Sequence, residues 1–486
     1  MIDRVLTFPE RRAVGMIVGI GLLFALAYGA SLVVRPKPGG RVVIGDALHH
    51  YVQLRSAVFD GDLHFENEYV RLYGLQGGEP GTEWVYEDTP TGHVRNLMPV
   101  GPALLWTPLF LLITTAVWLA NLAGAGYPLD GYARLFQATA GFSGIAAATA
   151  GVWLSWRACA ALFTARAAVW SCLVLWLASS ALYYSVISPT YSHAASLLAT
   201  SAFWYVWLRT RGPGSPEGLR YTPAASVERG RPEGQRFTAA TTGTSAVRRY
   251  VLLGLFAGVA ALMRWQDAIL LAPIALDLLI GVRTSSLSLT RAAGLGLAAV
   301  AAAALAFVPQ MLVWLTLYGQ PLAMPQGGGF MRWTEPALIS VLFSDFHGLF
   351  TWTPVVAIAV AGLVPLARRD GALAAGAVLF LVLSWYVNAA VADWWAGEAF
   401  GARRFVSCFP VLALALAALI DRWRPALRTL ALVATIIVVH TGLLLVQYQA
   451  FMHGLRDIAP YPRGDYNLWV ARFVVPFDLL RGWLAR

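Results

Sequence analysis

The chain has 486 residues, of which 58% are hydrophobic and only 13% are charged, and its mean hydropathy is +0.60. Too few polar side chains remain to cover soluble domains, so the composition excludes a soluble globular protein. The net charge of +10 does not indicate nucleic-acid binding, because Lys37 is the only lysine and most arginines lie beside apolar runs. Arginines in such places orient a chain in the bilayer and contact anionic lipid. The three cysteines lack metal-type spacing and predict neither a disulfide framework nor a zinc site.

Apolar runs long enough to cross a bilayer recur along the whole chain. Because backbone groups in lipid must be satisfied within the segment, these runs predict helices. They lie at about 14–34, 99–121, 132–154, 168–186, 193–208, 250–263, 268–281, 291–316, 347–366, 371–390, 404–420 and 427–449. The first run is too long for the core of a signal peptide and lacks a convincing cleavage site, so we expect a retained span. The predicted fold class is an all-α polytopic membrane protein.

Cationic loops predict the orientation, since short cytoplasmic loops carry an excess of arginine and lysine. The basic N-terminus and the segment 210–249 are expected in the cytoplasm, and the latter, rich in Gly, Pro, Ser, Thr and Arg, is expected to be disordered. If residues 99–121 crossed the membrane completely, every later loop would lie on the opposite side of the membrane. Arg157 and Arg166 would then lie outside the cytoplasm. Prolines within this run favour a re-entrant or surface-lying helix pair instead. This topology has about eleven crossings and an external C-terminus.

The unusual polar residues gather on one side of this predicted topology. Residues 1–449 form one transmembrane domain, and residues 450–486 form an external tail that follows it. The external segments are the first loop, 35–98, and the shorter stretches 187–192, 264–267, 317–346 and 391–403. A reaction or binding site at the outer boundary of the membrane follows.

The first external loop begins with a short predicted helix. From Asp46 to Phe59, apolar residues fall at helical spacing, which is typical of an amphipathic helix lying along a membrane face. Asp46 is placed either to cap this helix or to act as a base beside a membrane-embedded cavity. The acidic stretch 60–69 follows. Its spacing does not match a calcium loop, so a solvated turn is favoured over a metal site.

Several segments, in this order, resemble the GT-C superfamily of membrane glycosyltransferases, and most closely the bacterial relatives of protein O-mannosyltransferases and aminoarabinose–lipid A transferases. The resemblance covers about residues 10–420, and the order of the segments carries it. The segments are Asp46 with its helix, Asp60-Gly61-Asp62, Asn67-Glu68-Tyr69, 96–106, 188–193, 258–264, 345–354 and 394–405. One departure is that several relatives carry paired acids after the first span, whereas Ala47 follows Asp46 here.

The resemblance implies transfer of a sugar from a polyprenyl-phosphate carrier to an acceptor hydroxyl, usually with inversion. Asp46 is then the candidate general base. The leaving phosphate needs positive charge, which arginine supplies through bidentate donation. Arg264 interrupts two apolar runs at a hairpin tip, where the resemblance places a basic residue near the lipid phosphate. A salt bridge to Asp267 is the alternative role.

The other candidates lie in the same external segments. Arg403 and Arg404 are candidates for the donor phosphate, unless Glu398 and Asp393 merely neutralise them, and His347 is a candidate to support them. The substrate-binding candidates are His49, Tyr51, Arg55, Glu398, Trp394 and His193. His193 and His347 can instead have structural roles. His49 and His50 can instead face water or lipid headgroups, and Trp394 can instead belong to a belt of tryptophans at the membrane interface.

The sequence therefore predicts an inverting glycosyltransferase of a bacterial inner membrane, with its site facing the periplasm or exterior. The expected partners are a polyprenyl-phosphate-linked sugar, a lipid, glycan or protein acceptor, and membrane lipids, without nucleic acid. No cofactor is expected, although a divalent metal stays an alternative. A transporter or flippase of lipid-linked glycans would carry charges deep within its spans, and a polysaccharide polymerase or ligase would carry its main external loop late in the chain.

Overall fold

The computed structural model describes residues 8–34, 41–74, 83–211, 246–464 and 466–484, and nearly all of their regular structure is helical. Within these residues, nine segments are long and apolar enough to cross a membrane, or ten if a bent pair counts as one span, against about eleven expected. The all-α polytopic membrane fold is thus confirmed. Most of the predicted cytoplasmic loop 210–249 lies outside the described residues.

The helices have these bounds. The long ones are α1 Phe8–Val34, α4 Gly101–Leu122, α5 Arg134–Leu162, α8 Ser192–Arg209, α9 Ala246–Met263, α11 Leu289–Tyr318, α16 Gly371–Ala390, α17 Phe409–Trp423, α18 Leu427–Met452 and α19 Ala471–Leu484. The shorter ones are α2 Asp46–Arg55, α3 Glu66–Tyr73, α6 Ala165–Leu177, α7 Ser180–Val186, α10 Leu271–Arg283, α12 Leu338–Phe343, α13 Leu349–Trp352, α14 Pro354–Ala361 and α15 Leu363–Arg369. α6 and α7 form the bent pair, at 73°.

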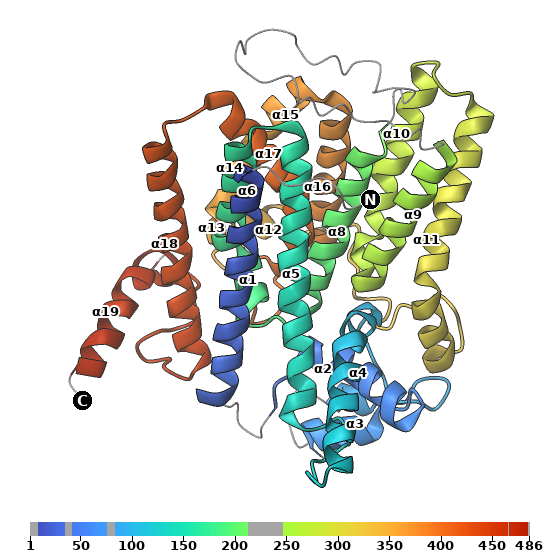
Figure 1. Ribbon diagram of the computed structural model, residues 1–486, viewed down its shortest axis with the longest axis vertical. Coiled ribbons are helices and arrows are strands. Elements are labelled where there is room, and N and C mark those ends of the chain that lie inside the picture. The colour runs from blue at the N-terminus through green and yellow to red at the C-terminus, as the bar shows by residue number, and fades with distance from the viewer. Residues whose placement is uncertain (1–7, 35–40, 75–82, 212–245, 465, 485–486) are drawn as a thin grey trace.

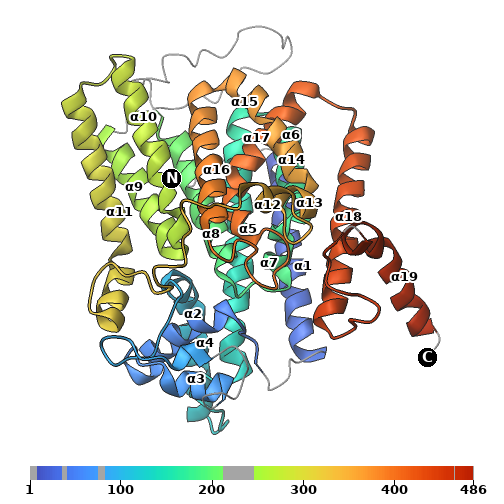
Figure 2. The ribbon, with the colours of Figure 1, turned by 180° about the vertical axis from the view of Figure 1, so that it is seen from behind.

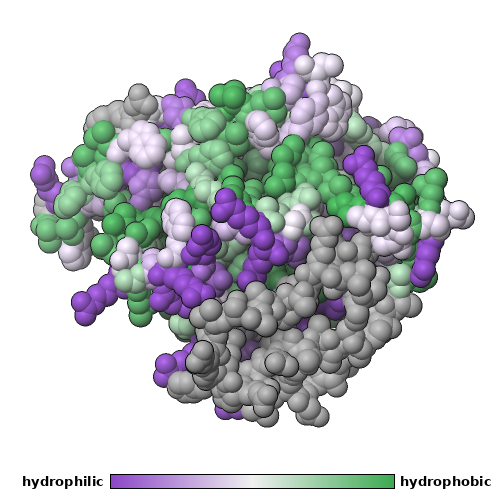
Figure 3. Space-filling model, turned by 90° about the horizontal axis from the view of Figure 1, so that it is seen from above, coloured by the Kyte–Doolittle hydropathy of each residue, from purple (hydrophilic) through white to green (hydrophobic). Residues whose placement is uncertain are grey.

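Figures 1 and 2 show the long helices as an upright bundle, with α2, α3 and α4 together at its lower end. α18 and α19 stand at the side of the bundle. We call the part of the chain from residue 41 to residue 133 the lobe. Seen from the opposite end, much of the visible surface is hydrophobic, and hydrophilic side chains project from several places at its edge (Figure 3).

The lobe leaves the bundle and returns to it at the same end. Arg134, the first residue of α5, donates to the carbonyl of Leu32 near the end of α1, so these two helices run antiparallel. α4 starts against Leu262 at the end of α9, and the turn after it returns to α2, where the Tyr51 hydroxyl donates to Gly131 at 2.6 Å. α4 is one continuous helix through Pro108, not the helix pair we expected. The start of α4 therefore lies at the end of α9, and the turn that follows α4 packs against α2 within the lobe.

Small residues allow α9 and α11 to approach closely. Gly254 and Gly258 lie one helical turn apart, and a Cβ on either would lie 2.0 or 2.3 Å from a carbonyl oxygen of α11, at Ala299 or Ala303. Small residues spaced in this way are typical of tightly packed membrane helices. α9 ends at the candidate site, so this contact also fixes the position of the hairpin tip that follows it.

Gly254→Ala is expected to destabilise the protein, because the added Cβ meets backbone that can move only with the whole of α11. Overpacking of this kind costs about 1–3 kcal/mol. The matched control is Gly442→Ala in α18, where nothing lies within 4 Å of the new Cβ and the change favours the helix by up to ~1 kcal/mol. Thermal unfolding in detergent should show a lower midpoint for the first variant only. Equal midpoints would contradict the close packing.

A buried charge cluster ties the helices together far from the lobe. Arg249 on α9 donates to Asp277 on α10 at 3.0 Å, and the hydroxyl of Tyr250 donates to the same carboxylate oxygen at 2.8 Å. Both charged side chains are about 95% buried. Because each charge has its partner, the ion pair explains how the charged Asp277 is accommodated inside a membrane span.

Candidate active site

Four chain segments bring the candidate residues together between the lobe and the bundle. They are the start of α2, the start of α8, the hairpin tip between α9 and α10, and the 3-10 turn Arg403–Cys408 that leads into α17. The first is in the lobe and the other three are at the lower ends of bundle helices (Figures 1 and 2). The structure therefore brings these four segments together.

Asp46 is paired with an arginine and does not cap its own helix. α2 begins at Asp46 itself, the residue before it is Gly45, and no side chain caps the first turn. Instead, Asp46 Oδ2 lies 3.0 Å from Arg403 Nη1. Gly45 has φ of 54°, and a Cβ there would lie 2.7 Å from the hydroxyl of Tyr191, so the turn that presents Asp46 requires glycine.

The charge on Asp46 is held by its surroundings. Burial acts to raise the pKa of this carboxyl, but the charge of Arg403, with smaller effects of His50, His49 and Arg264, outweighs burial and lowers the pKa below its usual value. Asp46 is therefore a carboxylate at neutral pH. About a third of its side chain is exposed, so a small substrate group can reach it.

The two adjacent arginines have different partners. Arg404 donates to Asp393 twice, from Nη2 to the carboxylate at 2.8 Å and from Nη1 to the backbone carbonyl at 2.9 Å. Arg403 pairs with Asp46 and lies over the ring of Tyr191, 5.4 Å from its centroid. Glu398 is exposed, and its backbone carbonyl accepts from Tyr448. Asp393 thus neutralises Arg404, as one of the two predicted roles for the arginines requires. Arg403 is instead paired with the candidate base, Asp46.

Arg264 lies at the hairpin tip and contacts α8. Its Nη1 is 2.8 Å from Nδ1 of His193 and 3.3 Å from the Ser192 hydroxyl, and its Nη2 donates to Gln266 at 3.1 Å. The predicted alternative of an Arg264–Asp267 salt bridge does not occur within 4.0 Å among the described residues, because Asp267 accepts from Ser196 on α8. Gln266 in turn donates to the carbonyl of Arg404 at 3.0 Å. This links the hairpin tip to the arginine pair.

The histidines of α2 are buried, contrary to the expectation that they face water or headgroups. His49 is 2% exposed, and its Nδ1 lies 2.9 Å from the Tyr69 hydroxyl. His50 is fully buried, with Nδ1 2.8 Å from the carbonyl of Pro99. Burial lowers the pKa of each histidine to about 4. Both rings are therefore neutral at neutral pH.

Two other predicted substrate ligands turn away from the site and hold the lobe together. Tyr51 is fully buried against Gly131, and Arg55 pairs with Glu68 at 2.9 Å and also with Asp60. The expectation of an exposed amphipathic α2 was wrong, since every residue of α2 after Asp46 is buried. Helical spacing of apolar residues shows one buried face, but it does not show that α3 and α4 cover the other faces as well.

A hollow lies beside the arginine pair. It measures about 240 Å³, counting the space that opens to solvent, and its lining includes His347, Trp394, Arg403 and Arg404. His347 is 2% exposed, and its nitrogens are engaged by the carbonyl of Trp395, at 2.5 Å, and by the Tyr461 hydroxyl. His347 therefore holds the wall of the hollow in place, and the arginines are the groups placed to bind an anion there.

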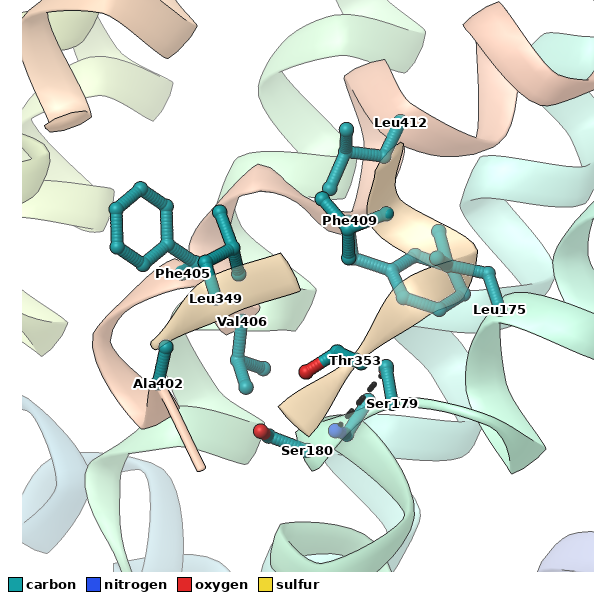
Figure 4. A pocket seen from close by; sticks show the side chains of 12 residues that line it. Leu175, Ser179, Ser180, Leu349, Thr353, Ala402, Phe405, Val406, Phe409 and Leu412 are labelled. Atoms are coloured by element: carbon teal, nitrogen blue, oxygen red, sulfur yellow. Dashed lines mark hydrogen bonds between the residues drawn. The ribbon is translucent and has the colours of Figure 1, made fainter. Parts of the chain in front are cut away.

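An apolar pocket lies on the other side of the same turn. It measures about 300 Å³, counting its open part, and Figure 4 shows leucine and phenylalanine side chains from α6, α13 and α17 around it. Ala402 and Phe405 line this pocket and the hollow alike. A cationic compartment and an apolar one therefore lie back to back across residues 402–405. Among the described residues, no group of three or more His, Cys, Asp and Glu side chains is placed to hold a metal ion.

Comparison with solved structures identifies the fold. ArnT from Cupriavidus metallidurans, bound to undecaprenyl phosphate, superposes with a TM-score of 0.51 over 95% of this chain and 77% of its own, at 15% sequence identity. The chain has the GT-C fold. Two structures of Archaeoglobus fulgidus oligosaccharyltransferase are more distant. AglB with an inhibitory peptide and a dolichol-phosphate shares 13% identity over 98% of this chain and 55% of its own, with a TM-score of 0.44.

The second of these, a complex with Zn and sulfate, shares 14% identity over 93% of this chain and 58% of its own, also at a TM-score of 0.44. This chain thus spans little more than half the length of either oligosaccharyltransferase, and at these scores neither supports a statement about its chemistry. No protein-family model matches the chain, and no curated protein sequence matches it.

Within this GT-C fold, one contribution to the site was missed in the sequence. Tyr461 follows α18 in the predicted external tail, yet it reaches His347 and also donates to the carbonyl of Ala399 at 3.1 Å. Its ring lies 4.8 Å from that of Phe451. A lone tyrosine in a mixed basic and apolar tail carries no periodic signal, so only the folded chain shows that the tail braces the wall of the hollow.

Proposed function

We propose that this protein is an inverting glycosyltransferase, which moves a sugar from a polyprenyl-phosphate donor to an acceptor hydroxyl at the extracytoplasmic face of the membrane. The observation that carries the proposal is the pairing of Asp46 with Arg403 beside Arg404 and Arg264. Such transfer requires a carboxylate to accept the hydroxyl proton and guanidinium groups to stabilise the departing phosphate. The GT-C fold and the undecaprenyl phosphate bound by ArnT support this donor class.

The mechanism uses the ion pair as it stands. Donor phosphate entering the cationic hollow attracts Arg403, which exchanges a single carboxylate for phosphate oxygens. Asp46 loses its partner at that moment and becomes free to accept a hydrogen bond from the acceptor hydroxyl. As the acceptor oxygen attacks the anomeric carbon, its proton passes to Asp46 and the bond to the phosphate oxygen breaks. The phosphate leaves as an anion held by Arg403 and Arg404.

The apolar pocket suits the lipid part of such a donor. Its wall is mostly leucine, valine and phenylalanine, with the polar side chains of Ser179, Ser180 and Thr353 on one side. It lies across residues 402–405 from the arginine pair, which matches a molecule with a phosphate joined to an isoprene chain. Burial of isoprene carbons there contributes affinity in proportion to the apolar area removed from water.

The orientation of the chain supports an extracytoplasmic site. Basic side chains lie at the end of the bundle opposite the lobe, including Arg368 and Arg369 in the last turn of α15 and Arg422 in the last turn of α17. Short cationic loops are expected in the cytoplasm, so the site faces the other side. The bacterial inner membrane and the periplasmic direction are part of this proposal.

The alternative of a transporter or flippase receives less support. Such a protein requires charged or polar groups that become accessible from both sides near the middle of the membrane. Asp277, an acid inside α10, is enclosed with Arg249 and Tyr250. A polysaccharide polymerase or ligase is also less favoured, because the longest segment at the site end is the early lobe.

The test uses protein reconstituted in liposomes with radiolabelled undecaprenyl-phosphate hexoses and pentoses and with an extract of lipid and glycan acceptors. We expect label to move from the undecaprenyl donor to an acceptor, with the opposite anomeric configuration in the product. Retention of configuration would overturn the single-displacement mechanism. Movement of intact donor across the bilayer without transfer of label would favour the flippase.

A further inference from the structure

The hollow beside the arginine pair is lined by one polar side chain that the proposed mechanism does not use. Asn388, near the end of α16, lines it together with Arg403 and Arg404 and is 2% exposed. Among the described side chains that have a buried polar atom without a hydrogen-bond partner, Asn388 alone lines the hollow or the apolar pocket. Such an atom costs free energy and rarely occurs without a reason.

The hydrogen bond of the Asn388 amide shows which of its ends is free. Nδ2 donates to the backbone carbonyl of Ser384, one turn earlier on α16, at 2.8 Å. A carbonyl oxygen can only accept, so the amino group faces Ser384 and Oδ1 is the end without a partner. The Ser384 carbonyl also accepts the helical bond from the backbone N–H of Asn388, so α16 does not need the side chain. The lining of the hollow therefore includes a spare hydrogen-bond acceptor.

The backbone around the hollow is held in an unusual conformation. Four non-glycine residues of the described chain have a positive φ, and two of them, His347 at 69° and Ala396 at 61°, line this hollow. Residues in this region of φ cost free energy and cluster where ligands bind. The bond between His347 Nδ1 and the carbonyl of Trp395, at 2.5 Å, joins the two strained segments. The chain thus maintains the wall of the hollow against this strain.

The groups in the lining match a sugar phosphate better than a phosphate alone. Anionic phosphate oxygens accept hydrogen bonds, so they pair with Arg403 and Arg404 and leave Oδ1 of Asn388 without a donor. A sugar hydroxyl is a donor that can fill this position. The indole rings of Trp394 and Trp395, which are half-buried in the same lining, offer apolar surface to the C–H groups of a sugar ring.

Arg403 connects the hollow to the candidate base. It lines the hollow, and its Nη1 lies 3.0 Å from Oδ2 of Asp46. The donor phosphate is attached to the anomeric carbon of the sugar, so the hydroxyl nearest to the phosphate is the one on the adjacent carbon, C2. Asn388 shares a hollow of only about 240 Å³ with the two arginines. The C2 hydroxyl is therefore the sugar group expected at Asn388.

We propose that Asn388 is a specificity-determining residue, whose Oδ1 accepts a hydrogen bond from the C2 hydroxyl of the transferred sugar. This inference rests on the proposed function, to which it adds the class of sugar. Asn388 distinguishes a sugar-loaded carrier from a bare one, and a sugar with a C2 hydroxyl from a 2-deoxy sugar.

The experiment combines one change in the protein with one change in the ligand. Asn388→Ala removes Oδ1. Ser384→Ala is the matched control, because it removes a buried hydroxyl one turn earlier on the same helix, outside the lining of the hollow. Binding of undecaprenyl phosphate and of undecaprenyl-phosphate mannose, glucose and arabinose is measured first for the wild type. The loaded carrier with the tightest binding is the reference, and its 2-deoxy analogue is the second ligand.

Wild-type protein should bind the reference roughly ten-fold more tightly than its 2-deoxy analogue, the value of one buried hydrogen bond. Asn388→Ala should bind both ligands equally, with roughly ten-fold weaker binding of the reference and a change of at most about two-fold for bare undecaprenyl phosphate. Ser384→Ala should bind all three ligands as wild type does. A residue that only supported the fold would weaken the binding of all three ligands alike.

The melting temperature without ligand gives an independent readout. Asn388→Ala removes an unpartnered acceptor, leaves the Ser384 carbonyl its helical bond and favours the helix, so the midpoint should not fall below that of wild type. A midpoint below wild type, together with equal losses of loaded and bare carrier, would make Asn388 a structural residue and overturn the inference.

Two further results would also overturn it. One is wild-type protein that binds the 2-deoxy analogue as tightly as the reference, or no loaded carrier more tightly than the bare one. The other is Asn388→Ala that still prefers the reference to its 2-deoxy analogue as wild type does. These are distinct from failure of the proposed function, which would appear as absence of both transfer and binding of undecaprenyl phosphate.

Discussion

Asp46→Asn should lose glycosyl transfer by about 10²–10⁴-fold, the usual effect of removing a positioned general base. The amide keeps the shape of the carboxylate but cannot accept the hydroxyl proton. Asp46 does not cap the first turn of α2, so any loss of stability comes from its lost pair with Arg403, and the melting temperature measures that loss separately from the rate. The rate is measured with saturating acceptor and donor in liposomes, and the melting temperature is measured in detergent.

The same variant should bind the lipid phosphate more tightly than wild type does. In the resting protein Asp46 holds Arg403 at 3.0 Å, and phosphate must compete with this carboxylate for the guanidinium group. Removal of the charge frees Arg403 for the donor. A variant that binds the lipid phosphate more tightly but no longer transfers sugar identifies Asp46 as the base. If Asp46 only maintained the shape of the site, its substitution would weaken phosphate binding.

Asp393→Asn is the matched control. It removes one carboxylate from the neighbouring arginine, Arg404, at a similar distance of 2.8 Å. Both substitutions lower the negative charge of the site equally, but only Asp46 is the candidate base. Transfer by the control should stay within about ten-fold of wild type. Comparable losses in the two variants would remove Asp46 from its catalytic role.

The membrane fold and the convergence of the external segments were predictable from the sequence because both follow from local rules. Apolar length predicts a span, and clustered arginines predict its direction. The re-entrant helix pair that these rules predicted at 99–121 is instead one continuous helix, because Pro108 does not break it. These rules placed Asp46, Arg264 and Arg403 at the same end of the bundle, where the structure brings them together.

The partners of each side chain were not predictable, because they depend on contacts between distant parts of the chain. Tyr51 and Arg55 follow Asp46 on the same helix and were grouped with it, but α4 and the turn at Gly131 enclose them. His50 depends on Pro99, 49 residues away, and His347 on Tyr461, 114 residues away. Hydropathy cannot tell which face of a short helix contacts protein and which contacts lipid.

Arg403→Gln should weaken binding of undecaprenyl phosphate by about thirty-fold or more, since loss of one partner of a buried charge pair costs 2–5 kcal/mol. It should also change the pH profile of the remaining transfer. Arg403 is the main influence that lowers the pKa of Asp46 against the effect of burial, so without it that pKa rises. A protonated carboxyl cannot accept the hydroxyl proton, so activity should fall at a higher pH in the variant than in wild type as the medium is acidified.

Arg403→Lys separates the two functions of this side chain. Lysine keeps the positive charge near Asp46, so the acid limb of the pH profile should stay close to that of wild type. It lacks the planar fork that binds two phosphate oxygens, so donor affinity should still fall. If Arg403→Gln binds donor as wild type does and shows the same acid limb, the ion pair has no part in transfer. In that case Arg264 and Arg404 become the phosphate ligands to test, because the link through Gln266 holds them together without Arg403.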